Sequence, residues 1–383
     1  MWLKALRLED FRVFARLELE LVPGLNFLYG PNGSGKTSIL EAVSWLAVSR
    51  SLRGASESEV VRWGTRRFGV GGECADGERR TTIVLRYERG GTREVTVDGA
   101  PLAKLSELVG VLRVSWFGPE DTAITKGGPA ERRRLLDLAL CQADHAYLAA
   151  LADYRRALRQ RNEALLAWGS DDDADALVDV WTEQLVRSGS RVVATRLGFL
   201  PAFGERVSAA HAAIAPGDSI TLSYRSSIAP PAGDASGTPD EGRGAVEWSA
   251  DEARTAQAFR DALRRVADEE RRRGLTLVGP HRDDLDVRLN ERSLRSFGSQ
   301  GQHRTAAIAL KLGEAAMLAQ DGRGVTVLLD DVASELDDRR SSALVEFVGG
   351  VGQALMTSTR PLPGTPGVAC AALRVERGEV ARA

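Results

Sequence analysis

Residues 30–37 read Gly-Pro-Asn-Gly-Ser-Gly-Lys-Thr, which fits the P-loop pattern G-x-x-x-x-G-K-[ST] at every fixed position. The largely apolar residues 26–29 before it predict a buried strand, and the spacing of apolar residues after it predicts a helix over 38–49. Glycines in such a loop let backbone N–H groups converge on phosphate oxygens, and the helix N-terminus adds partial positive charge. The order of strand, loop and helix therefore predicts a nucleotide-binding site rather than a glycine-rich turn without a ligand.

The side chains of this loop have separate expected roles. Lys36 is expected to reach the β- and γ-phosphates of ATP, and the Thr37 hydroxyl is expected to bind Mg²⁺. ATP and Mg²⁺ are therefore the expected cofactors. The loop residues predicted to bind the nucleotide are Gly30, Pro31, Asn32, Gly33, Ser34, Gly35, Lys36 and Thr37.

The composition is that of an ordinary globular protein of 383 residues, with 43% hydrophobic and 27% charged residues. The formal net charge is −2, so a surface for nucleic acid has to be a local basic patch. Cys74, Cys141 and Cys370 stand far apart, which argues against a disulfide framework and a zinc site. The first residues do not read as a signal peptide, and no apolar run is long enough to span a bilayer. We therefore expect a cytoplasmic protein without a membrane partner.

Alternation of apolar and polar residues predicts strands, and unbroken apolar runs predict strands buried in a parallel sheet. We expect the first two strands named below to open the nucleotide-binding sheet, the next three to form a small antiparallel sheet, and the last to be the final core strand. These predicted strands are 2–8, 16–21, 68–70, 82–87, 93–97, 111–117, 275–278, 325–329 and 353–357.

A helical, arginine-rich region lies between residues 130 and 274. Apolar residues repeat every seven positions in its first part, which predicts a short coiled coil, and Arg161 breaks one of the two seams. A second helix is expected to stop near Pro201, because proline removes a helical hydrogen bond. Residues 226–244 are rich in Pro, Gly and Ser and predict a flexible loop.

A Walker-B strand is predicted near the end of the chain, where four apolar residues lead into Asp330. Its carboxylate is expected to complete the Mg²⁺ shell begun by Thr37. Asp331 follows directly and is expected to orient or deprotonate the attacking water, so Asp331 and Lys36 are the predicted catalytic residues.

Two more motifs flank this strand. Ser299, Gly301 and Gln302 are predicted to lie in a polar loop over 296–302, whose hydroxyl and N–H groups are expected to face a γ-phosphate. A helix is expected to begin behind this loop at about His303, and we assign no role to His303 or Arg304. Residues 334–337, Ser-Glu-Leu-Asp, occupy the D-loop position of ABC-type ATPases.

The motifs occur in an order that resembles the ABC-type ATPase head of SMC-like proteins and, within that class, the RecF family. The resemblance runs from near residue 1 to near residue 360. The segments that carry it are 8–12, 30–41, 51–53, 118–121, 126–129, 132–137, 279–284, 299–304 and 328–337.

The resemblance implies an α/β fold: an ABC-type ATPase head with mixed and antiparallel sheets around the P-loop, and an inserted, mainly helical lobe with a short coiled coil. The expected division is a head formed by 1–129 and 275–383, with 130–274 inserted. In such heads the signature serine of one subunit, here Ser299, contacts nucleotide held by the P-loop of the other.

The resemblance also implies a function and partners. An ATP-dependent homodimer would bind duplex DNA at single-strand gaps or junctions and would assist RecA loading with RecR and RecO, in repair, replication and recombination and in the SOS response to DNA damage. The ATPase is expected to be weak and stimulated by DNA. Asp331 offers a reason for slow hydrolysis, because many ABC ATPases carry the longer Glu at that position.

Three consecutive arginines are the candidate DNA contacts. Arg132, Arg133 and Arg134 head a set of arginines that would suit phosphate contacts, and the resemblance favours these three. The alternative is a solvated helix face paired with acidic neighbours.

Three other classes of protein fit part of this pattern. Another SMC-like ATPase acting as a DNA clamp or organiser is the main alternative, although the lobe is too short for long coiled-coil arms. A transporter ATPase predicts Glu in place of Asp331, and a structural protein with a relic nucleotide site is the remaining class.

Overall fold

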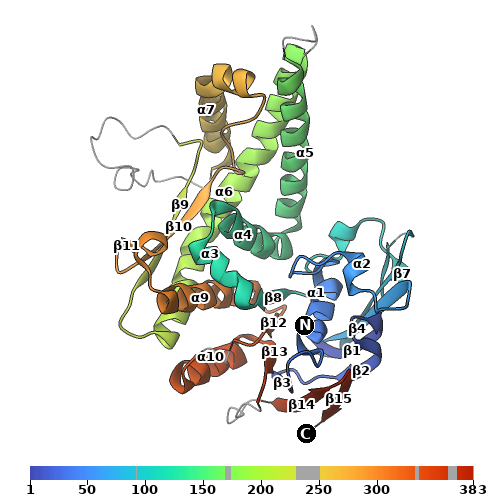
Figure 1. The fold of residues 1–383 in the computed structure, drawn as a ribbon. Helices are drawn as coiled ribbons and strands as arrows, with labels where there is room; N and C mark the ends of the chain where they lie inside the picture. The colour runs from blue at the N-terminus through green and yellow to red at the C-terminus, as the bar shows by residue number, and fades with distance from the viewer. Residues whose placement is uncertain (92, 169–173, 230–250, 333–335, 361–368, 383) are drawn as a thin grey trace. The chain divides into compact units, whose positions relative to one another are not determined.

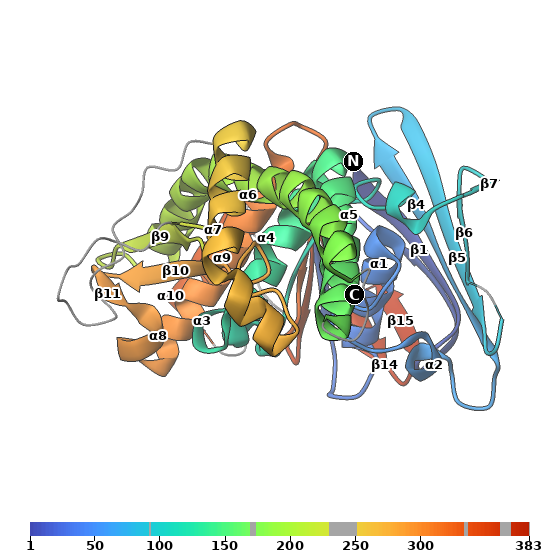
Figure 2. The ribbon, with the colours of Figure 1, turned by 90° about the horizontal axis from the view of Figure 1, so that it is seen from above.

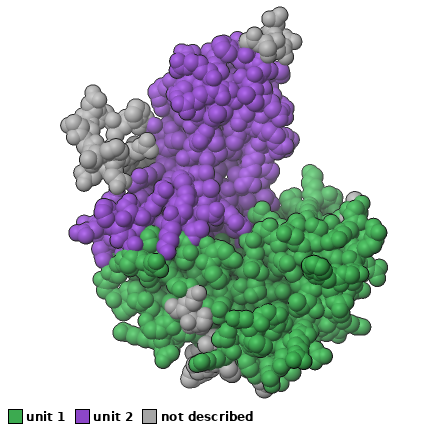
Figure 3. Space-filling model, in the orientation of Figure 1, with its two compact units in different colours: residues 1–122, 206–219, 299–383 green, residues 123–205, 220–298 purple. Residues whose placement is uncertain are grey.

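The computed structural model describes residues 1–91, 93–168, 174–229, 251–332, 336–360 and 369–382. These form two compact units, coloured separately in Figure 3. Unit 1 contains residues 1–122, 206–219 and 299–383, and unit 2 contains 123–205 and 220–298. Unit 2 therefore extends beyond both ends of the expected insertion at 130–274. Most of the expected loop at 226–244 lies outside the described residues.

The core of unit 1 is a six-stranded sheet in the order β15-β14-β3-β13-β12-β8. All neighbours pair in parallel except β14 and β15, which are antiparallel. The buried strands read as apolar runs because helices cover a parallel sheet on both faces. The prediction that 353–357 is the final core strand is wrong, since β14 and β15 follow it. The strands are β3 (Leu25–Tyr29), β8 (Val114–Phe117), β12 (Thr326–Leu329), β13 (Gln353–Ser358), β14 (Cys370–Glu376) and β15 (Glu379–Arg382).

A second six-stranded sheet of unit 1 is antiparallel, in the order β2-β1-β4-β5-β6-β7. The first two strands of the chain belong here and not to the nucleotide-binding sheet, which corrects the sequence-based expectation. Their alternating burial explains this, since one face packs on the core and the other is exposed. The strands are β1 (Trp2–Phe11), β2 (Phe14–Glu20), β4 (Arg67–Asp76), β5 (Arg79–Glu88), β6 (Arg93–Val97) and β7 (Ala100–Pro101).

The P-loop helix α1 (Lys36–Val48) lies between these two sheets (Figures 1 and 2). Nearly every side chain of α1 is buried, including Trp45, which packs edge-on against Phe68 of the antiparallel sheet. α9 (Gln300–Ala319) and α10 (Asp338–Val351) cover the other face of the core sheet (Figure 2). Unit 1 also contains α2 (Glu57–Val60) and two 3-10 turns, Leu105–Glu107 and Pro119–Thr122.

Unit 2 is built from helices and a three-stranded antiparallel sheet in the order β11-β10-β9. The pairing of β10 with β9 explains why residues after 274 belong to this unit. The predicted strand over 275–278 is absent. The elements are α3 (Ala123–Lys126), α4 (Pro129–Ala143), α5 (His145–Ala167), α7 (Glu252–Arg273), α8 (Leu294–Phe297), β9 (Ile220–Arg225), β10 (Asp284–Leu289) and β11 (Arg292–Ser293).

The long helix α6 (Ala174–Ile214) passes through Pro201 without ending, so the predicted stop is wrong. A proline inside a helix costs about 3 kcal/mol. Fully buried apolar residues before and after the proline, including Val193 and Phe203, offset that cost by packing. α6 begins in unit 2, and its residues from 206 onward are counted in unit 1.

Candidate nucleotide-binding site

The P-loop connects β3 to α1, and its glycines have positive φ angles. Gly35 has φ +109°, and a Cβ there would come within 2.7 Å of the Phe14 ring. A Cβ on Gly30 would lie 2.1 Å from the Val375 carbonyl oxygen. Gly33 has φ +76° and nothing within 4 Å of its Cβ position. The backbone therefore needs glycine for its packing at positions 30 and 35, whereas position 33 faces open space.

Two side chains of the loop suit a phosphate group. Lys36 Nζ donates to the carbonyl oxygens of Gly30 at 2.8 Å and Pro31 at 2.9 Å, which holds the ammonium group over the loop. Burial lowers the pKa of Lys36, while the charges of Asp331 and Asp330 act in the opposite direction. The Ser34 hydroxyl is buried and has no hydrogen-bond partner among the described residues. A buried polar group of this kind is costly unless a partner such as a phosphate oxygen satisfies it.

Thr37 and Asp330, which are 293 positions apart in the chain, are in direct contact. The Thr37 hydroxyl donates to Asp330 Oδ1 at 2.8 Å, and the Thr357 hydroxyl donates to the same oxygen at 2.8 Å. Parallel pairing of β12 and β13 brings the ends of these strands together. Burial raises the pKa of Asp330, against the hydrogen bonds from both threonines and the charge of Arg53. A hydroxyl beside a carboxylate is the oxygen donor set that Mg²⁺ prefers, so these residues fit the expected cation.

Asp331 follows with a left-handed backbone, φ +54°, and its N–H donates to Thr357 Oγ1 at 2.8 Å. Its charge acts on Lys36 and also on Arg304, whose pKa is lowered by burial. Arg304 therefore belongs to the electrostatic surroundings of the site, although the sequence assigned it no role. The signal was its position five residues after Ser299, near the N-terminus of α9.

Three of the segments that carried the family resemblance meet at Glu41, which is fully buried on α1. Arg12 donates to both carboxylate oxygens of Glu41, at 2.8 and 3.0 Å, and the Ser51 hydroxyl donates at 2.6 Å. This ion pair joins the β1–β2 turn and the segment after α1 to the P-loop helix. Arg53 also lies near the site, with 3.9 Å between its guanidinium and the Glu120 carboxylate.

The signature residues are placed differently from the expectation. Residues 300–302 form the first turn of α9 rather than a loop, and Ser299 is the helix N-cap. The Ser299 hydroxyl accepts from the Gln302 N–H at 3.3 Å, and the Gln302 side chain accepts from the Ser299 N–H at 2.9 Å. This capping box explains why the helix begins early. Ser299 and Gly301 are exposed, so the N-terminus of α9 is accessible.

The D-loop motif is described only in part. Ser334 and Glu335 lie outside the described residues. Asp337 is the N-cap of α10, and its carboxylate accepts from the Arg340 N–H at 2.9 Å. Its visible role is therefore to begin that helix.

The structure corrects the predicted DNA contacts within unit 2. Arg132 is only 4% exposed, and its guanidinium forms a two-point ion pair with Asp284 and donates to two backbone carbonyls. It is therefore not available for phosphate contacts. Arg133 is partly buried and donates to the Asp283 carbonyl oxygen at 2.6 Å. Arg134 is exposed. Arg161, which breaks the heptad seam, is buried in an ion pair with Glu270 at 2.7 Å.

The described residues lack two further features. They contain no group of three or more His, Cys, Asp or Glu side chains that could hold a metal ion. None of their helices has the length and apolar character that a membrane crossing requires.

The sequence matches one protein family and many curated proteins. Residues 2–362 match the RecF/RecN/SMC N terminal domain. A protein named DNA replication and repair protein RecF from Salinibacter ruber is 42% identical, with 96% of this chain and 87% of that protein covered. The protein of the same name from Acidothermus cellulolyticus is 39% identical, with 96% of both chains covered.

The fold is similar to solved structures of two kinds. A structure named as the recombination mediator protein RecF with ATP in the RecFOR pathway has a TM-score of 0.87 and 28% identity, covering 100% of this chain and 97% of that one. A structure of an SMC head bound to a domain of ScpA has a TM-score of 0.55 and 14% identity, covering 100% and 97%. The second likeness concerns the fold alone, which is that of an ABC-type ATPase head.

Proposed function

Because the chain belongs to the RecF family, whose members carry an SMC-like ATPase head, we propose that it is an ATP-switched DNA-binding protein of recombinational repair. ATP and Mg²⁺ drive two copies together head to tail on duplex DNA at single-strand gaps. Hydrolysis is weak and is stimulated by DNA. RecR and RecO are the proposed partners in loading RecA, since the similar solved structures are named for the RecFOR pathway.

The contact between Thr37 and Asp330 is the observation that carries this proposal. It joins the P-loop to the Walker-B strand in one oxygen-rich centre, beside an ammonium group and a buried hydroxyl that has no partner among the described residues. Bound ATP would lie on the loop N–H groups with its γ-phosphate near Lys36, and Mg²⁺ would lie between Thr37 and Asp330. Asp331 would orient the attacking water.

Head-to-tail dimerisation is supported by the position of Ser299. Its hydroxyl stands at the exposed N-terminus of a 20-residue helix, where backbone N–H groups and the helix dipole favour a phosphate. The hydrogen bond that the Gln302 N–H donates to the Ser299 hydroxyl is long, at 3.3 Å. A charged phosphate oxygen would therefore compete effectively with that hydroxyl for the Gln302 N–H. A second copy would therefore complete the γ-phosphate site.

Sedimentation with and without ATP·Mg²⁺ and gapped duplex DNA tests this proposal. The parent protein should dimerise only with nucleotide and more readily with DNA. Ser299→Arg should leave ATP binding intact and lower dimerisation at least tenfold, because the bulky cation blocks the partner's phosphate. Ser208→Arg, the same change at an exposed serine of α6, is the matched control and should dimerise normally.

Lys36→Ala tests whether assembly depends on nucleotide, since it should abolish ATP binding and dimerisation with it. A Ser299→Arg protein that still dimerised would remove the trans contact from the mechanism. A parent protein that stayed monomeric at saturating ATP and DNA would remove the dimer itself.

A further inference from the structure

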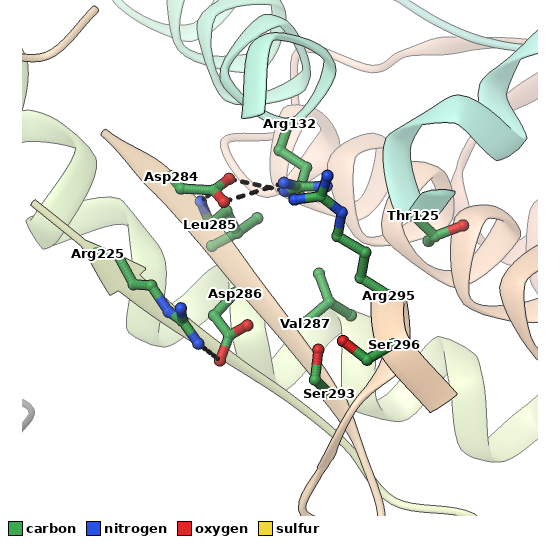
Figure 4. A pocket seen from close by; sticks show the side chains of 10 residues that line it. All are labelled: Thr125, Arg132, Arg225, Asp284, Leu285, Asp286, Val287, Ser293, Arg295 and Ser296. Atoms are coloured by element: carbon green, nitrogen blue, oxygen red, sulfur yellow. Dashed lines mark hydrogen bonds and ion pairs between the residues drawn. The ribbon is translucent and has the colours of Figure 1, made fainter. Parts of the chain in front are cut away.

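A cavity of about 190 Å³ lies within unit 2 (Figure 4). It opens beside the N-terminal half of α4, strand β10 and the short helix α8. Sites for drug-sized ligands are typically about 300–1,000 Å³, so this cavity suits a small ion or one group of a larger chain. Its lining residues are Thr125, Arg132, Arg225, Asp284, Leu285, Asp286, Val287, Ser293, Arg295 and Ser296.

The two carboxylates of the cavity are already neutralised by arginines. Asp284 forms the two-point ion pair with Arg132, at 2.7 and 3.0 Å. Asp286 Oδ2 lies 3.0 Å from the Arg225 guanidinium and 2.9 Å from that of Arg288. Arg295 adds a fourth guanidinium, so the cluster holds four positive charges against two negative ones.

Three donors in the lining have no partner of their own. No hydrogen bond or ion pair to another described residue is formed by the side chains of Arg295, Ser293 or Ser296. Figure 4 shows the Arg295 side chain extending toward Arg132, so two guanidinium groups of like charge face the same space. An anion placed there would reduce their repulsion and accept hydrogen bonds from Arg295, while the hydroxyls of Ser293 and Ser296 line the same cavity nearer the backbone of Arg295 (Figure 4).

We propose that this cavity binds a phosphate group, with Arg295 as the principal contact and Ser293 and Ser296 as hydroxyl donors. The proposal rests on the DNA-binding function proposed above, because a backbone phosphate of DNA is the source that a small, open, positive cavity fits best. Arg132 takes part as a buried, fixed charge rather than through a free N–H group. A free phosphate ion has the same chemistry, and the test separates the two sources.

The first measurement is duplex DNA affinity across a salt series at saturating ATP·Mg²⁺. Arg295→Gln should weaken binding about fivefold to tenfold and lower the salt slope by about one, since one phosphate contact is lost. Arg292→Gln removes the same charge from an exposed neighbouring position that does not line the cavity, and should bind as the parent does. Arg295 is exposed, so neither change should disturb folding.

The second measurement is the thermal stability of the same proteins with inorganic phosphate against chloride at equal ionic strength. Phosphate binding at the P-loop should stabilise the parent and Arg295→Gln equally. Any difference in phosphate stabilisation between the two proteins therefore measures binding in the cavity. If Arg295→Gln both weakens DNA binding and loses the stabilisation by inorganic phosphate, the cavity binds a DNA phosphate. If Arg295→Gln loses only the stabilisation by inorganic phosphate, the cavity binds a free phosphate ion. If Arg295→Gln matched the parent in both measurements, the phosphate site would be refuted. Failure of the parent to bind DNA would instead refute the proposed function. The thermal stability measurement with inorganic phosphate would still test whether the cavity binds phosphate.

Discussion

Asp330 in unit 1 and Asp283 in unit 2 are both buried carboxylates whose pKa is raised by burial, yet their surroundings differ. Asp283 is 0% exposed and receives four donors. The Ser227 N–H and hydroxyl donate to Oδ1, and the hydroxyls of Tyr224 and Ser226 donate to Oδ2. Asp330 is 7% exposed, and among the described residues it receives only the hydroxyls of Thr37 and Thr357, both on Oδ1.

The difference separates a structural carboxylate from one that retains coordinating capacity. An ionised carboxylate has about four acceptor positions, and at Asp283 donors of the described chain fill them all. At Asp330 one oxygen receives no hydrogen bond from the described residues, so it remains available to a cation. Burial alone therefore does not mark a functional acid, because the number of donors already satisfied decides between the two roles.

Arg196 in unit 2 is also surrounded by hydrogen-bond partners, as Asp283 is. This buried guanidinium donates to Asp137, to the hydroxyls of Tyr147 and Tyr224, and to the Pro280 carbonyl oxygen. All of its partners lie inside the unit. The segment 279–284, which the sequence associated with the RecF family, thus serves the core of unit 2.

The largest expected effect comes from replacing the saturated carboxylate. Asp283→Asn replaces one acceptor oxygen with an NH₂ group, which faces two donors and cannot accept from them. Because these donors are then left unsatisfied, the free energy of unfolding should fall by about 3 kcal/mol. Asp330→Asn is the matched control and should change it by less than about 1 kcal/mol, because the Asn oxygen can still accept from both threonine hydroxyls while its NH₂ group replaces the oxygen that has no donor among the described residues. Urea denaturation followed by circular dichroism measures both. Equal losses in the two variants would contradict the comparison.

A smaller effect is expected on Mg²⁺. In the parent protein Mg²⁺ should tighten ATP binding about tenfold, or about 1.4 kcal/mol, and Asp330→Asn should lose this tightening. Mg²⁺ requires the ionised carboxylate, and a raised pKa keeps the protonated form to higher pH. The Mg²⁺ effect should therefore weaken on acidification at a pH above 3.8, the ordinary value for Asp, and Asp330→Asn should show no such pH dependence. ATP titrations with and without Mg²⁺ across pH measure it. Mg²⁺ tightening that survived in Asp330→Asn would exclude Asp330 as a ligand.

The ATPase elements were predictable from local sequence. The P-loop pattern, the apolar run of β12 and the helix after the P-loop each depend on a few neighbouring residues. The structure has this strand and this helix, although α1 begins at Lys36 rather than at the expected residue 38. The proximity of Thr37 and Asp330 followed from assigning a shared Mg²⁺ ion to the P-loop and the Walker-B strand, since no local pattern links residues so far apart. The structure then placed the Thr357 hydroxyl on the same oxygen, which no motif indicated.

Unit 2 was harder to predict because tertiary contacts override local preference there. Residues 275–278 alternate like a strand, but the Thr276 N–H donates to the Asn162 side chain and the Leu277 N–H donates to Glu270. Side chains thus satisfy the groups that a neighbouring strand would have paired. Arg132 and Arg161 read as surface charges for the same reason, since their partners Asp284 and Glu270 lie more than 100 positions away. Sequence alone gives no distance between such groups.

The smallest expected effect is on the pH dependence of the free energy of unfolding and comes from His281. It tests whether the hydrogen-bond network of unit 2 excludes protons as well as cations. Tyr154 Oη lies 2.5 Å from His281 Nδ1, and Nε2 lies 3.2 Å from the Thr276 carbonyl oxygen. A neutral imidazole satisfies both bonds, accepting at Nδ1 and donating from Nε2. Burial lowers the pKa of His281 from 6.5 to about 4.

Because this pKa is depressed in the folded state, the stabilising contribution is fully present above pH 6.5 and is lost as the pH falls toward 4. Between pH 7 and pH 5.5 the loss should be about 1 kcal/mol in the parent protein. In His281→Gln this part of the pH dependence should disappear, because the titrating group is gone. Urea unfolding at the two pH values measures the difference. An unchanged pH dependence in His281→Gln would show that protons reach the unit 2 network at another group.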